Sequence, residues 1–526
     1  MRRFYSKTSI IVLLFTVLVL VSAGKTLSFG FWKDDWITYW AIKTFSWQYF
    51  KHWLHPGNNI HFLLFTYLLP PNTIGWQILG IFWKVAATFS VFHLTNTINS
   101  LSDKNDNRSI RAGIIAGSLF AVTPLGLDTV GWTTLSVLNI DICLISLTLS
   151  TFIVFIRKNR KRYFFLSCLY LLCTLFSDPF RSNPIIGVVF LLGLLTIRHR
   201  ILIHIRQSIS LLPVAGFILV LVLSWQLPRI QETVLFQFVF NHKDNLPVLV
   251  SKIYVIGNYF ASIGNIFLGP FVKVYEEAST GEYSRVLARL SFIILCLLFS
   301  LAIWLWKKRH KQAIPFIIFL NWIVLFYIPN WLAEPRLTMG VTHRYMAISG
   351  IGWIGIITLC ITSLSKRLSI FITIFLVVWM SILSQQYIAD WSPYRSRSLT
   401  EAIWNTIEKE VPPLDGYNIF FVTTNHPIWN YNLVYSSTVP YAIRRNILKL
   451  ENFPLLTNDV SIVSQFLCKD FQRIVYGQGE IPQRKMLPSQ VFSWNIQSNG
   501  SIQTTTLETR KFLAHINERK ECIVNE

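Results

Sequence analysis

Two adjacent acidic residues follow the first apolar run of the chain, and they are the residues best suited to do chemistry. The segment Phe31–Trp36 reads FWKDDW, so Asp34 and Asp35 lie where a membrane helix is expected to end. Charges at a membrane edge are costly, so they mark candidate functional sites. One carboxylate of a pair can accept a proton while its neighbour orients a partner or binds a metal ion. Asp34 and Asp35 are therefore the leading candidates for catalysis.

Further polar candidates fall in loops that the charge pattern assigns to the same face of the membrane. Negative charge on a phosphate leaving group can be neutralised by Arg, Lys or His. A positioned carboxylate can activate a hydroxyl that attacks a sugar. The residues suited to these roles outside the acid pair are His55, Asp128, Arg181, His343 and Arg344.

Each of these residues also has a purely structural interpretation. A lone acid at a helix end is more often a cap or a solvated side chain, and Asp178 before Pro179 fits that description best. A lone Arg such as Arg344 is as often a helix-end residue that reaches the lipid headgroups. Lys84 lies inside an apolar run, where an unpaired ammonium costs roughly 2.5–3.5 kcal/mol, so it should face the helix bundle and a partner, or reach the headgroups.

Composition predicts a membrane protein. The chain has 526 residues, of which 52% are hydrophobic and only 14% charged, too little polar surface for a soluble globule of this size. Several apolar runs approach or reach the roughly 20 residues that span a bilayer as a helix. They are Ile10–Ala23, Ile74–Asn96, Leu211–Trp225, Phe292–Trp306 and Phe371–Tyr387.

The net charge of +22 does not indicate a nucleic-acid partner, because the basic residues form short clusters between apolar runs. Such clusters favour the cytoplasmic side of a membrane. If successive loops lie on alternate sides of the membrane, every basic cluster can be cytoplasmic, provided that Lys252–Val272 does not cross. This arrangement has about eleven spans, a cytoplasmic N-terminus and an external C-terminus. The first run resembles a cleavable signal peptide, but the orientation of later spans favours a retained anchor.

The sequence divides near residue 389 into a membrane module, 1–389, and a small soluble α/β domain, 390–526, on the external face. Ser398 and Glu401 have capping-box spacing and predict the start of a helix. Tyr417–Val422 reads as a buried strand, and Asn499-Gly500 predicts a hairpin. Cys468 and Cys522 fall in this domain, where a disulfide between them stays an open question.

Three motifs in order resemble those of GT-C-fold membrane glycosyltransferases, such as the protein O-mannosyltransferases and the lipid A aminoarabinose transferases. The first is the acid pair followed by His55-Pro56, the second is Thr123–Trp132 with its acid at Asp128, and the third is Thr342–Tyr345. Thr123 replaces the family's usual His, Asp128 its commoner Glu, and His55 its usual Arg. The matches cover the chain as far as about residue 385.

The charge pattern predicts an all-α bundle of about eleven transmembrane helices with the C-terminal domain outside. The resemblance implies that this bundle is GT-C-like and lies in a bacterial plasma membrane. It implies inverting transfer of a sugar from a polyprenyl-phosphate donor to a lipid, glycan or protein acceptor. Asp34 or Asp35 would be the general base, with Asp34 favoured, and Arg344 would bind the donor phosphate. Metal use differs within the family, so a divalent ion stays open, with Asp34, Asp35 and Asp128 as candidate ligands.

Two other functions compete with this interpretation. A transporter, or a flippase for lipids or oligosaccharides, would also carry polar groups inside a helix bundle. Transporters tend to have repeats, broken helices and sites near the midplane, whereas this chain shows no repeat and most of its acids lie at one edge. The second alternative is a degenerate family member that binds its ligand without catalysis.

Overall fold

The structure is a computed structural model, and its helices and strands fall into two compact units. The described residues are 2–32, 34–46, 56–101, 106–158, 160–178, 185, 187–188, 246–274, 282–333, 337–411, 418–424, 439–447, 454–460, 463, 471–474, 480–484, 487–497 and 501–518. The first unit comprises Met1–Thr26, His52–His61 and Gln77–Ile388. The second comprises Leu27–Lys51, Phe62–Trp76 and Ala389–Glu526.

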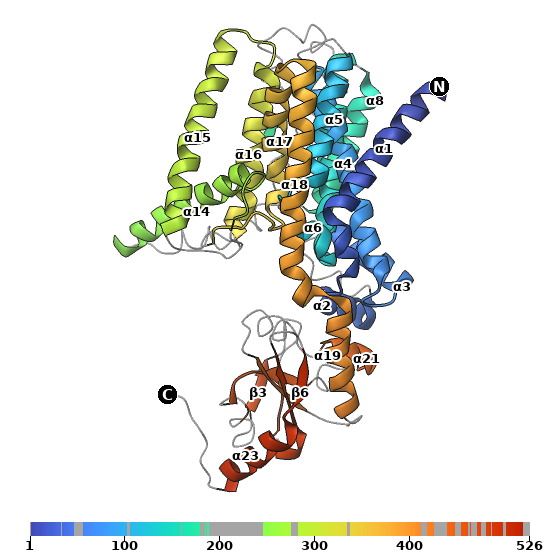
Figure 1. Cartoon of the computed structure of the whole chain (residues 1–526), viewed down its shortest axis with the longest axis vertical. Helices are drawn as coiled ribbons and strands as arrows, with labels where there is room; N and C mark the ends of the chain where they lie inside the picture. The colour runs from blue at the N-terminus through green and yellow to red at the C-terminus, as the bar shows by residue number, and fades with distance from the viewer. Residues whose placement is uncertain are drawn as a thin grey trace. The chain divides into compact units, whose positions relative to one another are not determined.

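The first unit is a bundle of helices (Figure 1). Among the described residues, seven helices are long and apolar enough to cross a membrane, which makes the chain a polytopic membrane protein. These candidate spans are Thr8–Ser28, Ile74–Asn99, Thr133–Lys158, Tyr283–Lys307, Ala313–Leu332, Met346–Ser363 and Lys366–Arg395. The predicted run Leu211–Trp225 lies outside the described residues, and the total of about eleven spans stays a prediction.

The helices of this unit are named by their order in the chain. They are α1 (Arg2–Ala23), α4 (Ile74–Asn99), α5 (Asp106–Val122), α6 (Asp128–Gly131), α7 (Val137–Lys158), α8 (Lys161–Ser177), α14 (Leu246–Leu268), α15 (Glu282–Lys307), α16 (Ala313–Ala333), α17 (Met346–Ser363) and most of α18 (Lys366–Arg395). Helix α3 (Pro56–Leu68) runs from this unit into the second. Glycines let α16 and α17 approach closely, since a Cβ on Gly352 would meet the backbone nitrogen of Ile323 at 2.9 Å.

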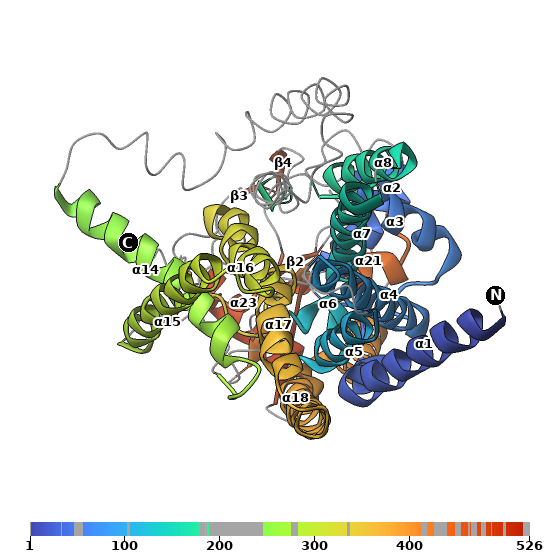
Figure 2. The same ribbon diagram turned by 90° about the horizontal axis from the view of Figure 1, so that it is seen from above.

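Helix α14 lies steeply inclined to α15, α16 and α17 (Figures 1 and 2). Its polar side chains bond to the loop that precedes α17: the Asn265 amide donates to the Met339 carbonyl at 2.7 Å, and the Ser262 hydroxyl accepts the Met339 N–H at 3.0 Å. Trp331 of α16 donates its indole N–H to the Val255 carbonyl at 2.7 Å. These bonds make α14 a support for that loop. Its apolar helical stretch, Val255–Leu268, is shorter than a full span.

Basic residues gather where α5 and α18 begin and α15 ends, an end of the bundle that also holds the N-terminus (Figure 1). We call this the basic end. Its basic residues include Arg108, Arg111, Lys307, Lys308 and Lys366. The positive-inside rule predicts that the basic end faces the cytoplasm.

Cysteine labelling tests that orientation. In a cysteine-free background, Lys308→Cys should react with a membrane-impermeant maleimide only after permeabilisation, whereas Leu487→Cys in the second unit should react in intact cells. Both side chains are exposed, so accessibility reports the side of the membrane. Labelling of Lys308→Cys in intact cells would mean that Lys252–Val272 crosses and that the span count is wrong.

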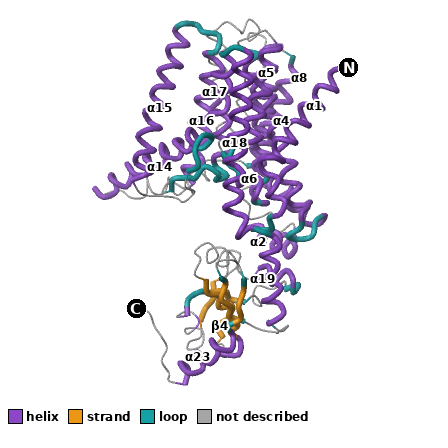
Figure 3. The backbone as a smooth tube through the Cα atoms, viewed as in Figure 1, coloured by secondary structure: helices purple, strands orange, loops and turns teal. Residues whose placement is uncertain are grey.

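The second unit contains a four-stranded sheet in the order β2-β1-β5-β6 (Figure 3). β1 (Ile419–Thr424) pairs in parallel with β2 (Leu455–Thr457) and β5 (Val491–Ile496), and β5 pairs antiparallel with β6 (Ile502–Thr504), as the hairpin signal predicts. A separate antiparallel pair joins β3 (Phe471–Ile474) to β4 (Glu480–Arg484). The remaining helices are α2 (Asp34–Phe45), α19 (Arg397–Glu410), α21 (Val439–Arg444) and α23 (Thr506–Glu518).

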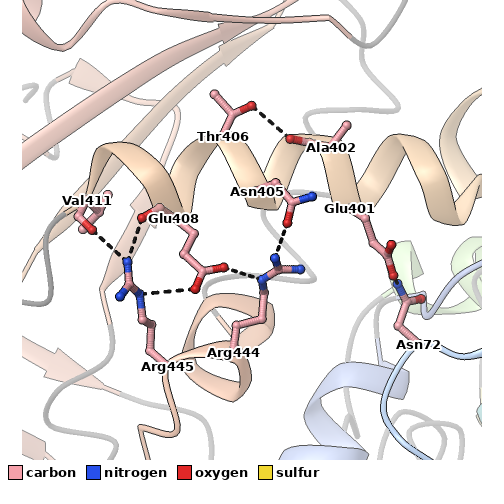
Figure 4. Close-up of polar contacts among 9 residues, drawn as sticks. All are labelled: Asn72, Glu401, Ala402, Asn405, Thr406, Glu408, Val411, Arg444 and Arg445. Atoms are coloured by element: carbon pink, nitrogen blue, oxygen red, sulfur yellow. Dashed lines mark hydrogen bonds and ion pairs between the residues drawn. The ribbon is translucent and has the colours of Figure 1, made fainter.

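Helix α19 begins earlier than the capping-box spacing predicts. Its N-cap is Ser396, whose carbonyl accepts the Thr400 N–H at 3.0 Å, so Ser398 lies inside the helix. The Glu401 carboxylate accepts a bond from the Asn72 amide at 2.9 Å (Figure 4). The predicted capping box is therefore wrong: Ser398 does not cap the helix, and a tertiary partner holds Glu401.

Glu408 of α19 joins this helix to α21 in the same unit. Its carboxylate accepts a bond from the Arg444 Nε at 2.7 Å, and the Arg445 Nε lies 3.6 Å from it (Figure 4). Ile403, Trp404 and Ile407 of α19 pack into the core beside the sheet. The helix therefore has one face in the core and an ion-paired face against α21.

Candidate functional site

The acid pair lies in the first turn of α2, in the second unit, and its two members differ in environment. Asp35 is buried, and its Oδ2 accepts the backbone N–H of Trp32 at 2.8 Å. The Asp35 N–H returns a bond to the Trp32 carbonyl at 2.9 Å. This reciprocal pair holds the start of the helix in the manner of a capping box. Asp34 is exposed. The geometry gives Asp35 a structural task and leaves Asp34 accessible.

The strand-like segment before the acids is held by residues far away in the sequence. The Gly30 N–H donates to the Arg395 carbonyl at 2.9 Å, and the Arg397 guanidinium donates to the Phe29 carbonyl at 3.0 Å. The Asn72 side chain accepts the Phe31 N–H at 2.6 Å. Because the same amide also donates to Glu401, it ties this segment to α19 (Figure 4). These bonds fix the approach of the chain to Asp34.

Aromatic side chains pack around this turn. The Phe31 ring lies edge-on to Trp36 and Trp76, with centroids 5.2 and 5.5 Å apart. The Arg395 guanidinium lies 4.9 Å from the centre of the Trp32 ring. Burial raises the pKa of the Tyr39 phenol on α2, so this group stays protonated at neutral pH. The turn that carries Asp34 and Asp35 therefore packs against aromatic side chains.

In the first unit, the other two motifs are joined by main-chain bonds. The Gly126 N–H donates to the Val341 carbonyl, and the Asp128 N–H donates to the Thr342 carbonyl, both at 3.0 Å. Gly126 has a φ of 69°, and a Cβ there would lie 2.6 Å from the Ala347 backbone nitrogen. Glycine allows both the conformation and the close approach. The fold therefore brings Asp128 next to the loop of His343 and Arg344.

Buried amides brace the segment that carries Asp128. The Asn139 side chain, fully buried at the start of α7, donates to the Thr129 carbonyl at 3.0 Å. Gln77 of α4 donates to the Thr133 hydroxyl at 3.3 Å. Asp128 itself is only 7% exposed. A bond from α7 thus holds short helix α6, and a bond from α4 holds the 3-10 turn, Thr133–Leu135, that follows it.

Arg344 lies among aromatic rings. Its guanidinium carbon is 4.9 Å from the centre of the Tyr345 ring and 5.7 Å from that of Trp132, and one of its N–H groups reaches the Tyr345 hydroxyl at 3.3 Å. The Arg344 Nε is buried and has no hydrogen-bond partner among the described residues. A buried donor without an acceptor is costly, so an anionic ligand here would remove that cost.

Replacing Gly126 should disturb this arrangement. Gly126→Ala would put a Cβ into the Ala347 backbone and force a left-handed conformation on alanine, which we expect to cost about 1–3 kcal/mol of stability. Thermal unfolding in detergent measures the loss. Gly257→Ala is the matched control, because no atom lies within 4 Å of the added Cβ. Equal unfolding temperatures for both variants would contradict the close approach.

The structure accounts for the predicted residues as follows. Asp128, His343 and Arg344 are brought together in the first unit, while Asp34 and Asp35 share one turn of the second. His55 and Arg181 lie outside the described residues. Among the residues described, no three His, Cys, Asp or Glu side chains form a group that could hold a metal ion. The question of a divalent metal therefore stays open.

Sequence reasoning missed the residues that position these side chains. Asn72 and Asn139 act through their amides, and their signal is only a polar residue within or beside an apolar stretch. Lys84 did carry a signal, and the structure buries it in the bundle with its ammonium 3.8 Å from the centre of the Phe120 ring. The expectation that it faces the bundle is confirmed.

No family model matches the chain, and no curated protein matches it. The function is therefore inferred from the residues and contacts of each unit.

Proposed function

We propose that this protein is a membrane glycosyltransferase that moves a sugar from a polyprenyl-phosphate donor to an acceptor hydroxyl. The observation that carries the proposal is the pairing of two loops in the first unit. They combine a buried acid, Asp128, with a guanidinium, Arg344, whose Nε has no hydrogen-bond partner among the described residues. A phosphate group on a substrate would supply the missing acceptor. The aromatic rings beside Arg344 limit its side-chain freedom before the ligand binds.

The proposed reaction uses one residue as the general base and another as the ligand of the donor phosphate. Asp34 takes the proton of the acceptor hydroxyl as its oxygen bonds to the anomeric carbon. The bond from that carbon to the donor phosphate breaks, the configuration inverts, and the polyprenyl phosphate leaves with the bonding electrons. Arg344 of the first unit is the proposed ligand of the donor phosphate. Asp35 orients the turn through its bond to Trp32.

The proposal extends to the cellular setting. Transfer would take place on the external face of a bacterial plasma membrane, opposite the basic end, because lipid-linked donors present their phosphate at a membrane edge and the basic end favours the cytoplasm. A lipid, a glycan or a protein would be the acceptor. The second unit, which carries the acid pair, would lie on that external face.

A transporter or flippase is the second candidate, and buried charge inside the bundle favours it. Lys84 lies within α4, and the Asp141 carboxylate within α7 accepts a bond from the Ser177 hydroxyl at 2.5 Å. Ionisable groups at this depth often mark a path for ions or substrates. Lys84→Met should abolish transport if this candidate is correct and should leave sugar transfer intact if it is not.

The cellular experiment is a comparison of cell-envelope lipids and glycans by mass spectrometry. Cells lacking the gene should lose one glycosylated species and accumulate its unmodified acceptor. Re-expression of the wild type should restore that species, and Asp34→Asn expressed to the same level should not. An unchanged glycan and lipid profile upon deletion would contradict the proposed function.

A further inference from the structure

A pocket of about 840 Å³ opens at the basic end of the first unit. It lies where α5 begins, α17 ends and α18 begins. These three helices are neighbours in both views of the bundle (Figures 1 and 2). The pocket lining follows α5 from Asn107 to Ile115, whereas the Asp128 loop follows the other end of this helix, so Arg111 lies roughly 17 Å along the helix axis from Val122. The pocket is therefore a different place from the proposed sugar-transfer site.

Three basic side chains line this pocket. Arg111 and Arg108 each donate to the Thr362 carbonyl, at 3.0 and 3.3 Å. The Arg111 Nε is buried and has no hydrogen-bond partner among the described residues. Lys366 also lines the pocket, and none of the described lining residues is acidic. The described lining therefore carries three cations and no acidic side chain.

Apolar side chains from the same two helices also line the pocket. Ile110 and Ile114 contribute from α5, and Ile370 and Ile374 from α18. Ile110 is 39% exposed, Ile370 48% and Ile374 59%. Ile370 and Ile374 lie on a candidate membrane span, Lys366–Arg395, so side chains this apolar and this exposed are expected to contact lipid tails. The pocket thus combines a cationic rim with an apolar wall that continues along two helices.

We infer that this pocket binds one anionic phospholipid, with the phosphate at Arg108, Arg111 and Lys366 and the start of an acyl chain along the isoleucines. The charge fits an anionic headgroup, and basic pockets between membrane helices on the cytoplasmic side bind such headgroups. A phosphate oxygen would satisfy the buried Arg111 donor. A free phosphate ion would use the rim but leave the apolar wall unfilled. The inference does not depend on the proposed sugar transfer.

Lipid retention measured by native mass spectrometry tests the inference. Protein released from nanodiscs of equal phosphatidylglycerol and phosphatidylcholine should keep one phosphatidylglycerol in preference to phosphatidylcholine. The variant Arg108→Gln/Arg111→Gln/Lys366→Gln should lower that retention about tenfold or more, as expected for the loss of at least one charge-assisted bond. The control Lys307→Gln/Lys308→Gln/Lys311→Gln removes the same charge from exposed positions of the basic end and should change retention little.

A second variant separates the apolar wall from the charges. Ile374→Trp keeps all three cations and should also lower retention, because the larger ring would fill the acyl-chain path. Ile374→Trp still tests the inference if the triple variant fails to fold. Inorganic phosphate should not displace the lipid. The inference is overturned if wild type shows no preference for phosphatidylglycerol, if the control loses as much lipid as the triple variant, if phosphate displaces the lipid, or if Ile374→Trp retains it fully.

Discussion

Asp34→Asn is expected to slow sugar transfer by roughly 10²–10⁴-fold, which is the usual cost of losing a general base. Asparagine has nearly the shape of aspartate but cannot take up the acceptor proton as a carboxylate does. Asp34 is exposed at the start of α2, so the change should lower the thermal midpoint of unfolding only slightly, by the loss of a negative charge from the first turn of the helix. The initial rate of transfer by purified protein, with unfolding followed in parallel, measures both effects.

Alanine variants at the two acids separate catalysis from structure. Asp35→Ala removes the acceptor of the Trp32 N–H and should cost about 0.5–2 kcal/mol of stability, as loss of a helix cap does. Asp34→Ala should lower the rate and cost less stability than Asp35→Ala, because Asp34 is exposed whereas Asp35 is buried. If Asp35→Asn loses activity while Asp34→Asn keeps full activity, Asp35 is the general base and Asp34 is not. Full activity in both asparagine variants would favour the transporter or a protein that only binds.

Arg344→Ala is expected to weaken binding of the donor by about 1.5–3 kcal/mol, the typical value of a hydrogen bond to a charged group. This corresponds to an increase in Kd of roughly 10- to 150-fold. Arg344→Lys should recover only part of the affinity, because an ammonium lacks the planar fork of a guanidinium. Binding of a polyprenyl phosphate to the detergent-solubilised protein gives the Kd directly, without turnover.

The chain offers a matched control for this substitution. Arg162, like Arg344, precedes a tyrosine. Its guanidinium carbon also lies 4.9 Å from the centre of that ring, and one of its N–H groups donates to the tyrosine hydroxyl. Arg162 is exposed, however, and next to the basic cluster that follows α7. Arg162→Ala should therefore leave donor affinity unchanged. Equal losses in both variants would make Arg344 a headgroup anchor rather than a phosphate ligand.

Local sequence patterns predict much of the membrane unit. Apolar runs such as Ile74–Asn96 are long enough to indicate a helix, and α4 ends only three residues beyond this run. The acid of Thr123–Trp132 and the Arg-Tyr pair at 344–345 were both singled out, and the structure joins their loops. The contact depends on Gly126 and its positive φ, which sequence alone does not reveal.

Contacts between distant segments were not predictable. The segment before Asp34 belongs to the second unit because Gly30 and Phe29 bond to Arg395 and Arg397, more than 360 positions away. The Asn72 amide bonds to the Glu401 carboxylate, so Glu401 does not form the capping box expected with Ser398. Such bonds leave no periodic signal in the chain, since they depend on one side chain meeting one backbone group.

The most direct test of the proposed activity is sugar transfer by the purified protein from a radiolabelled polyprenyl-phosphate sugar. The account predicts a labelled acceptor, release of polyprenyl phosphate in equal amount, and a product anomer inverted relative to the donor. Asp34→Asn at the same concentration should give at most about a hundredth of the product. If the protein, reconstituted in vesicles, moves the intact donor across the bilayer and no sugar is transferred, the account is contradicted.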